Sequence, residues 1–309
     1  MGPGSVETKY QKVIRSPTGK PGFPAGGPTV DTNASLERGG PGFAFLDHRS
    51  SERLTASSKI PTSTSGAYRF PTAGDTVVII PAYQEAGAIG AVIDELRGSI
   101  DPMVLVVDRP GDDGTGSVAR GKGALVLDQT DRGKGNAIRL GLDFVRRYCP
   151  QVQYVGLVDA DHTYPTASLA AMREILRTEP STGMVVGLRE HLRNNGTNSL
   201  LFAFGNRMLA RCHATLNGIP LRDPLSGLRL VRFDALEKWS PKARGFDVEC
   251  ELNHQVHNVR RLSISEIPIP YRTRIGKKKL RLRHGVAIFG RMVALSLGGK
   301  LGRKHREKS

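Results

Sequence analysis

Two aspartates, Asp159 and Asp161, follow a short apolar run that ends at Val158. Residues 153–158 are rich in β-branched side chains, as expected of a strand that is covered on both faces of a parallel sheet. Carboxylates one residue apart on an extended chain point the same way, so this pair is suited to holding a hard divalent cation through oxygen. The same pattern is also typical of a solvated turn that caps the next helix, and the pair alone does not decide between the two.

Acidic residues also follow two earlier apolar runs. Glu85 comes after residues 76–80, and Asp108 comes directly after residues 103–107. Open α/β sheets bind their ligands at the carboxyl ends of the strands. Carboxylates that converge there suit a nucleotide and its metal, with Asp108 able to accept from a base N–H or a ribose hydroxyl. Acidic residues at three strand ends therefore favour a ligand site over a set of ordinary polar turns.

Apolar runs of strand and helix character alternate from residue 75 onward and must position these carboxylates. Residues 111–116 are predicted to be a turn. The alternation predicts an α/β fold with a mostly parallel sheet, flanked by helices and linked by right-handed crossovers. The expected strands cover 76–80 (closed by Pro81), 103–107, 124–127, 153–158 and 184–187, and the expected helices cover 86–97, 136–148 and 167–177.

The second half of the chain is less regular. It predicts helices at 198–216 and 245–256, a loop at 223–227, and strands at 228–231 and 262–269. A basic amphipathic helix is expected at 282–297, with Leu282, Val286, Phe289 and Val293 on one side. That helix has two interpretations, which are contact with anionic lipid headgroups and packing on the domain.

The net charge of +16 lies mostly at the two ends of the chain. Residues 1–74 hold nine Lys/Arg and five Asp/Glu, residues 275–309 hold eleven Lys/Arg and one Glu, and the middle is near +2. Eight Pro and eleven Gly in residues 1–74 predict an irregular or disordered extension. We therefore expect an extension at 1–74, a domain at 75–275, and a basic helix and tail at 276–309.

Composition excludes several classes of protein. The three cysteines are far apart, which indicates neither a disulfide framework nor a zinc knuckle. No apolar run is long enough for a transmembrane helix, and no signal-peptide pattern is present, so a cytoplasmic protein is expected. A basic RNA-binding protein is a further alternative, but the near-neutral middle region and the lack of an aromatic-basic stripe count against it.

Several ordered motifs resemble those of family 2 glycosyltransferases. Residues 81–85, Pro-Ala-Tyr-Gln-Glu, are similar to the family's opening motif, and Asp108 with 113–115 is similar to its nucleotide motif. The Arg132-Gly-Lys-Gly-Asn-Ala and Asp159-Ala-Asp-His-Thr-Tyr-Pro runs follow in the expected order. The 223–227 loop, Gly245-Phe with Glu249, and residues 271–277 are similar to the dolichyl-phosphate mannose/glucose synthase branch. The resemblance covers roughly residues 76–290.

This resemblance implies a GT-A (Rossmann-like) fold and inverting, metal-dependent transfer of a sugar from a UDP- or GDP-sugar. It places Mg²⁺ or Mn²⁺ on Asp159 and Asp161, with Thr163 as a further metal-site group. It implies a nucleotide pocket and a diphosphate site that involve Pro81, Tyr83, Glu85, Asp108, Asp113, Arg132, Lys134 and Asp159. Groups that approach the acceptor or the leaving diphosphate, or act in catalysis, are then Asp161, Arg189, Asp223, Glu249, Arg272 and Arg274.

One position departs from the family pattern, because Arg109 stands where the nucleotide motif has a second Asp. Two acceptors remain open. A polyprenyl (dolichyl) phosphate is already anionic and needs no strong base, which would suit an enzyme peripheral on the cytoplasmic membrane face. A small-molecule hydroxyl acceptor, as in specialised metabolism, needs a base, for which Asp223, Asp247 and Glu249 are the candidates. No nucleic-acid partner is expected.

Overall fold

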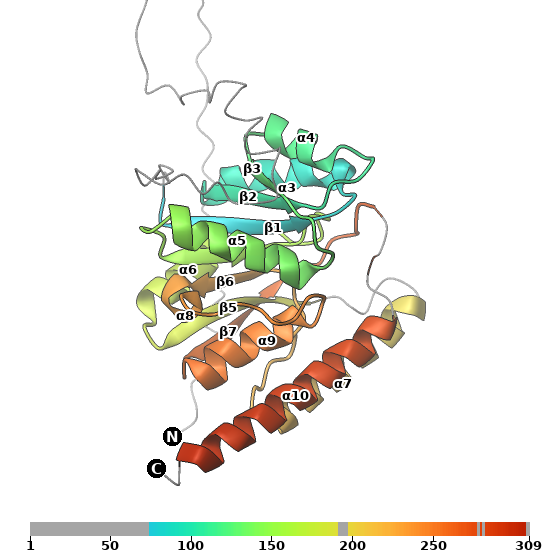
Figure 1. Cartoon of the computed structure of the whole chain (residues 1–309). Helices are drawn as coiled ribbons and strands as arrows, with labels where there is room; N and C mark the ends of the chain where they lie inside the picture. The colour runs from blue at the N-terminus through green and yellow to red at the C-terminus, as the bar shows by residue number, and fades with distance from the viewer. Residues whose placement is uncertain (1–73, 191–196, 277–278, 280–281, 307–309) are drawn as a thin grey trace, which may run out of the picture. The chain divides into compact units, whose positions relative to one another are not determined.

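A seven-stranded sheet forms the centre of the computed structural model, which describes residues 74–190, 197–276, 279 and 282–306 (Figure 1). The spatial order of its strands is β3-β2-β1-β4-β6-β5-β7. Neighbouring strands run parallel except at β6, which is antiparallel to both β4 and β5. The predicted α/β architecture with a mostly parallel sheet is thus confirmed. The strands are β1 Thr76–Ala82, β2 Met103–Asp108, β3 Leu125–Asp128, β4 Tyr154–Leu157, β5 Thr182–Arg189, β6 Arg229–Arg232 and β7 Ser263–Ile269.

Helices cover both faces of this sheet because alternate side chains of each central strand point to opposite sides. Val77 and Ile79 of β1 pack into a core with α5 (Lys134–Tyr148), α8 (Phe233–Leu236) and α9 (Val248–His254). Val78 and Ile80 pack into a second core with α3 (Ala86–Ser99), α4 (Thr115–Gly121) and α6 (Ser168–Thr178). These two layers hold the strand ends, and thus the predicted site, in place.

A smaller apolar cluster joins α7 (Thr197–Asn217), α9 and α10 (Leu282–Arg306). Leu209 of α7, Cys250 of α9, and Ile288 and Met292 of α10 are its buried members. The Asn217 side chain also donates to the Met292 carbonyl at 3.2 Å. Helices α7 and α10 therefore lie side by side, although some 65 residues separate them along the chain (Figure 1).

Pro81 does not close the first strand as predicted, because β1 continues to Ala82. Arg109 N–H donates to Ala82 O on the β2 side, and Val158 N–H donates to Ile79 O on the β4 side. Pro81 therefore faces the β4 side, two residues beyond the last residue of β1 that pairs with β4. Since no neighbouring strand needs its missing N–H, the proline is tolerated inside the strand.

Three helices also differ from expectation. The predicted turn is present at 111–114 but ends earlier than expected, because the unpredicted helix α4 begins at Thr115, where Asp113 accepts from the Thr115 N–H and hydroxyl. Helix α9 ends at His254 and continues as a π-helical turn, Gln255–Val259. Helix α10 extends to Arg306, beyond the predicted end at residue 297.

The predicted irregular extension, residues 1–74, lies outside the described residues except for Gly74. None of the helices in the described part of the chain is long and apolar enough to cross a membrane.

Candidate functional site

The predicted acidic residues gather at the carboxyl ends of β1, β2 and β4. One guanidinium, that of Arg274, lies 3.1 Å from Glu85 Oε1 and 3.1 Å from Asp161 Oδ2. Glu85 comes from the turn after β1 and Asp161 from the loop after β4, so their shared partner shows that the two strand ends converge. Lys279 adds a second ion pair to Glu85.

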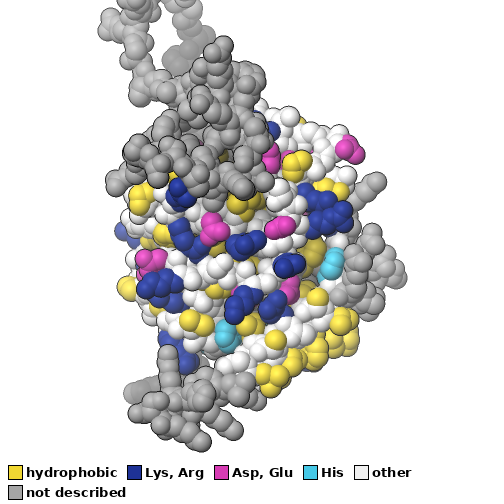
Figure 2. Space-filling model, viewed as in Figure 1, with side chains coloured by type: hydrophobic (Ala, Val, Ile, Leu, Met, Phe, Trp, Pro, Cys, Tyr) yellow, Lys and Arg dark blue, Asp and Glu magenta, His cyan; other side chains and the backbone are white. Residues whose placement is uncertain are grey.

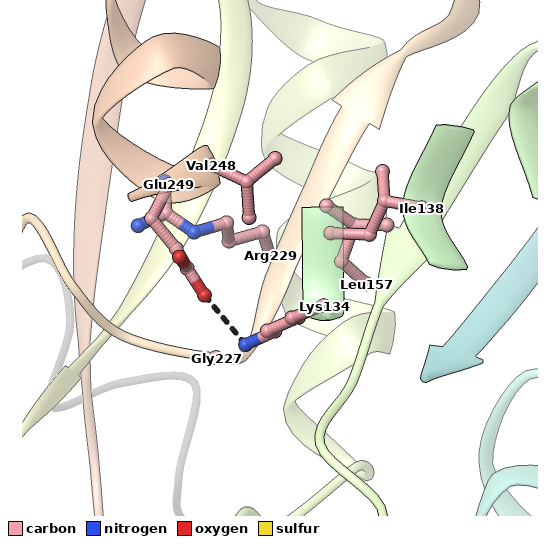
Figure 3. Close-up of a pocket in the computed structure, with 7 residues that line it drawn as sticks. All are labelled: Lys134, Ile138, Leu157, Gly227, Arg229, Val248 and Glu249. Carbon is pink, nitrogen blue, oxygen red and sulfur yellow. Dashed lines mark ion pairs between the residues drawn. The ribbon is translucent and has the colours of Figure 1, made fainter. Parts of the chain in front are cut away.

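Lys134 joins two more of the predicted residues at the start of α5. Its ammonium lies 2.6 Å from Asp159 Oδ1 and 2.5 Å from Glu249 Oε1, and Figure 3 shows Lys134 and Glu249 pointing toward one another. Burial alone would raise the pKa of Asp159, but the charge and hydrogen bond of Lys134 outweigh it, so the pKa is lowered. The same ion pairs raise the pKa of Lys134 despite its burial. Asp159 and Lys134 are therefore both charged at neutral pH.

Gly227 makes room for the Asp159 carboxylate. A Cβ at this position would lie 2.2 Å from Asp159 Oδ2. The Gly227 N–H donates to the Tyr164 hydroxyl at 2.8 Å, which fixes the glycine against the loop after β4. The residues around Lys134 also line a small pocket whose members come from α5, β4, the loop before β6, β6 itself and α9 (Figure 3). They are Lys134, Ile138, Leu157, Gly227, Arg229, Val248 and Glu249.

Thr163 orients Asp161. Its hydroxyl and its backbone N–H donate to Asp161 Oδ1 at 2.6 Å and 3.1 Å. Thr163 is fully buried behind Asp161. Its hydroxyl therefore holds the carboxylate in place, with Asp161 Oδ2 directed toward Arg274.

The composition of this charged cluster fits a divalent cation that arrives with a diphosphate. Four carboxylates, those of Glu85, Asp159, Asp161 and Glu249, share the three cations Lys134, Arg274 and Lys279. Glu85 Oε2 and Glu249 Oε2 are buried without a hydrogen-bond partner. Within the described residues no group of three or more His, Cys, Asp or Glu forms a ready-made metal site. A cation here therefore needs phosphate or water oxygens to complete its ligands, as Mg²⁺ commonly does.

Asp108 differs from the other carboxylates because it forms no ion pair with any of the described residues. Burial, followed by the charges of Asp113 and Asp128, raises the pKa of Asp108 to about 6. Its Oδ1 atom is buried without a hydrogen-bond partner. Its Oδ2 faces Gly116, where a Cβ would approach within 2.9 Å. Asp108 therefore presents one free oxygen that is suited to accept from a ligand.

Asp113 supports the turn that carries Glu85. Its carboxylate accepts from the Ala86 N–H at 3.0 Å and from the Thr115 hydroxyl at 2.8 Å. The Thr115 hydroxyl in turn accepts from the Glu85 N–H at 2.9 Å. These bonds join the N-termini of α3 and α4, so in this structure Asp113 links the starts of the two helices.

Arg109, the departure from the family pattern, lies over an aromatic ring. Its guanidinium carbon is 4.8 Å from the centroid of the Tyr83 ring, and the Lys279 ammonium is 5.7 Å from the same centroid. Tyr83 and Arg109 follow β1 and β2, with Pro81 just before them in β1. The position that carries a carboxylate in the family pattern thus carries a cation stacked on Tyr83.

Arg189 and Asp223 form a second charged group, beside Tyr271. Arg189 donates to both Asp223 oxygens, at 2.6 Å and 2.7 Å, and lies 5.4 Å from the Tyr271 ring centroid. Asn206 of α7 adds a bond of 3.1 Å to Asp223. Burial would raise the pKa of Asp223, but Arg189 lowers it below its ordinary value.

Two predicted residues point elsewhere. Arg272 makes a bidentate pair with Glu95 of α3, at 2.7 Å and 2.9 Å, and contacts His162 at 3.1 Å. Its backbone N–H donates to Thr163 O, so Arg272 fastens the 271–275 segment across the loop after β4. Arg132 is exposed in the loop before α5 and is not brought into the acidic cluster.

Sequence reasoning missed Arg229, which is 1% exposed inside β6. It donates to the carbonyls of Pro224 and Ser226, at 2.6 Å and 2.8 Å, and to Asn253 Oδ1 at 2.6 Å. It therefore fixes the loop that carries Asp223 and Gly227. The sequence does contain a signal for this role, because a cationic residue inside a short apolar strand must be buried and must therefore find polar partners.

Comparison with known proteins identifies the family of the chain. The family model described as Glycosyl transferase family 2 matches residues 77–240, more than half of the chain. The chain belongs to this family. Glycosyltransferase AglJ of Haloferax volcanii is 33% identical over 183 residues, or 59% of this chain and 58% of AglJ. The chain thus matches only just over half the length of that relative. Dolichyl-phosphate hexose transferase of the same organism is 29% identical over 225 residues, or 72% of this chain and 93% of the relative.

Solved structures of glucosyl-3-phosphoglycerate synthase from Mycobacterium tuberculosis share the fold. The complex with phosphoglyceric acid has a TM-score of 0.56 and 21% identity, covering 72% of this chain and 79% of that one. The complex with Mn²⁺, UDP and glucosyl-3-phosphoglycerate has a TM-score of 0.53 and 22% identity over the same shares. The predicted GT-A fold is confirmed by this likeness, which at such identity carries the fold alone.

The packing of Asp159 on Gly227 gives a direct test of the site. Gly227→Ala should displace the carboxylate from Lys134 and lower the free energy of unfolding by about 1–3 kcal/mol, the range for added atoms in a packed site. Gly205→Ala in α7 is the matched control, because nothing lies within 4 Å of its Cβ. Urea denaturation measures both, and equal stability of the two variants would contradict the described contact.

Proposed function

We propose that this chain transfers a sugar, with inversion, from a nucleoside-diphosphate sugar to a polyprenyl phosphate, in a reaction that depends on a divalent cation. Membership of family 2 supports the transferase chemistry. The dolichyl-phosphate hexose transferase, matched over 93% of its length, supports the acceptor class. Different side chains support the donor, the metal and the acceptor of this reaction.

The donor is proposed to bind across the ends of β1, β2 and β4. The unpartnered Asp108 oxygen is proposed to accept from the base or the ribose, near the stacked pair of Arg109 and Tyr83 that follows β2 and β1. Lys134 and Arg274, each held between two carboxylates, are the cations proposed to contact the diphosphate. As the anomeric C–O bond breaks, charge builds on the leaving diphosphate, and positioned cations stabilise it most in the transition state.

The proposed cation would be held by Asp159 and Asp161 together with the donor's phosphate oxygens. When bound, it would supply Lewis-acid stabilisation of the leaving diphosphate. Thr163 holds Asp161 for this purpose, and Gly227 leaves space for the Asp159 carboxylate.

The observation that carries the choice of acceptor is that every candidate base is held in an ion pair. Asp223 is paired with Arg189, Asp247 with Arg291 at 2.9 Å, and Glu249 with Lys134. A carboxylate whose pKa is lowered by a guanidinium, as for Asp223, is a weak proton acceptor. An acceptor that is already anionic needs no base, and an in-line phosphate oxygen can attack the anomeric carbon directly.

A small-molecule hydroxyl acceptor is the second candidate. Glu249 supports it, because its Oε2 atom is buried without a hydrogen-bond partner and is therefore available to accept a hydrogen bond from an acceptor hydroxyl. The product of the reaction separates the two candidates.

The proposed role of Asp108 predicts a pH dependence of donor binding. If donor N–H or O–H groups bond to its carboxylate form, affinity rises as the pH passes through about 6 and levels off above that value. From about pH 5 to about pH 7 the gain should be roughly tenfold for one such group. Calorimetry with UDP-glucose and GDP-mannose measures it. Asp108→Asn should abolish the rise, the exposed Asp112→Asn should keep it, and a flat profile in the unaltered protein would rule out this role.

The acceptor is tested by following radiolabel from UDP- and GDP-sugars. With a polyprenyl phosphate in detergent, label should enter an organic-extractable product that mild acid releases. Lys134→Met should reduce the rate by about a hundredfold or more, since it removes a positioned cation. Asp94→Asn, at an exposed ion pair on α3, should leave it unchanged. Label in a water-soluble, acid-stable glycoside would favour the hydroxyl acceptor instead.

A further inference from the structure

Helix α10 has two apolar stripes, and within the described part of the chain one of them is covered while the other is largely exposed. Ile288 and Met292 pack into the cluster with α7 and α9. Val286, Phe289 and Leu297 remain 73%, 43% and 57% exposed. The predicted apolar stripe of this helix is therefore not the one that packs on the domain. A helix that is apolar on more than one side is expected to have a second apolar environment.

Helix α7 continues the exposed apolar surface. Phe204 and Met208, one turn apart, are 64% and 49% exposed. Five of the eight exposed large hydrophobic side chains in the described part of the chain thus lie on these two helices. Figure 2 shows hydrophobic side chains gathered along the lower edge of the molecule, where Figure 1 places α7 and α10. We call this surface the α7–α10 face, defined by Phe204, Met208, Val286, Phe289 and Leu297.

The charge of the two helices indicates what covers this face. Together, α7 and α10 contain eight Lys/Arg and no Asp/Glu in their sequences. Arg207 and Arg211 are exposed on α7 beside the apolar residues. A second copy of the chain would bring the same uncompensated positive charge to a shared interface. An anionic lipid surface instead complements both the apolar and the basic groups.

We propose that the α7–α10 face docks on an anionic bilayer, with its apolar side chains at the headgroup boundary. The same helices reach the acceptor side of the candidate site. Asn206 of α7 bonds to Asp223, and Arg291 of α10 bonds to Asp247. Docking would therefore hold that side of the site against the membrane that contains the acceptor. This last point rests on the proposed polyprenyl phosphate acceptor, whereas the docking itself does not.

Vesicle sedimentation tests the docking. The full chain should bind vesicles of phosphatidylcholine and phosphatidylglycerol, bind neutral vesicles more weakly, and lose affinity in high salt. A variant with Phe204→Ser, Val286→Ser and Phe289→Ser should bind at least about tenfold more weakly. The control carries Val118→Ser and Val259→Ser, at exposed apolar positions on α4 and the π-helical turn. Equal binding by the two variants would overturn the proposal. So would a finding that the unaltered chain and the control variant are dimers in solution whereas the triple variant is a monomer.

The acceptor is tested separately with two substrates. The triple variant should keep full turnover of a water-soluble, short-chain polyprenyl phosphate and lose at least about tenfold on a long-chain one in vesicles. Loss on both substrates would mean that the face belongs to the catalytic machinery, which contradicts a docking role. No transfer by the unaltered chain to either substrate, with vesicle binding intact, would sink the proposed function and leave the docking standing.

Discussion

The arrangement of the site depends on one buried ammonium group. Lys134 lies between Asp159, in the loop after β4, and Glu249, on α9. Removing one partner of such a buried pair leaves an uncompensated charge, which typically costs several kcal/mol. The start of α5, the loop after β4 and the start of α9 are thus held in one relative position. Loss of Lys134 would therefore disturb the loop after β4 and helix α9 together.

Two glycines allow Lys134 to reach this position. A Cβ on Gly133 would lie 2.0 Å from the Arg244 carbonyl, and one on Gly135 would lie 1.9 Å from the Ala243 carbonyl. Gly133 also adopts a φ of 114°, which side chains strongly disfavour. The start of α5 consequently packs directly on the backbone before α9, with Gly135 N–H donating to Arg244 O at 3.0 Å. The Gly-Lys-Gly spacing is explained by this close approach.

Much of the fold follows from local patterns, because buried parallel strands and amphipathic helices differ in period and length. The strand ends at Glu85, Asp108 and Asp159 were placed on one edge by that logic, and the structure brings them together. Helix α4 was missed because its start depends on hydrogen bonds of Asp113, which also bonds to the first residue of α3. A helix of seven residues is too short to show a clear periodic pattern of apolar residues.

The partners of the site residues were harder to predict. Arg272 and Arg274 are two residues apart, yet Arg272 pairs with Glu95 while Arg274 pairs with Glu85 and Asp161. Neither pairing can be predicted from the spacing of residues along the chain, since the partners lie more than a hundred residues away. Lys279 was hidden inside a basic run. The covered stripe of α10 was also unpredictable, because it depends on contacts with α7 and α9 rather than on its own pattern.

The central claim is that Asp159 and Asp161 hold a cation on the diphosphate of a nucleotide-sugar donor. Its most direct test is the melting temperature of the protein with UDP-glucose or GDP-mannose, with and without Mn²⁺. One of the two donors should raise the melting temperature only when the metal is present, and Asp159→Ala and Asp161→Ala should each abolish the rise. Stabilisation that persists without metal, or in both variants, would contradict it.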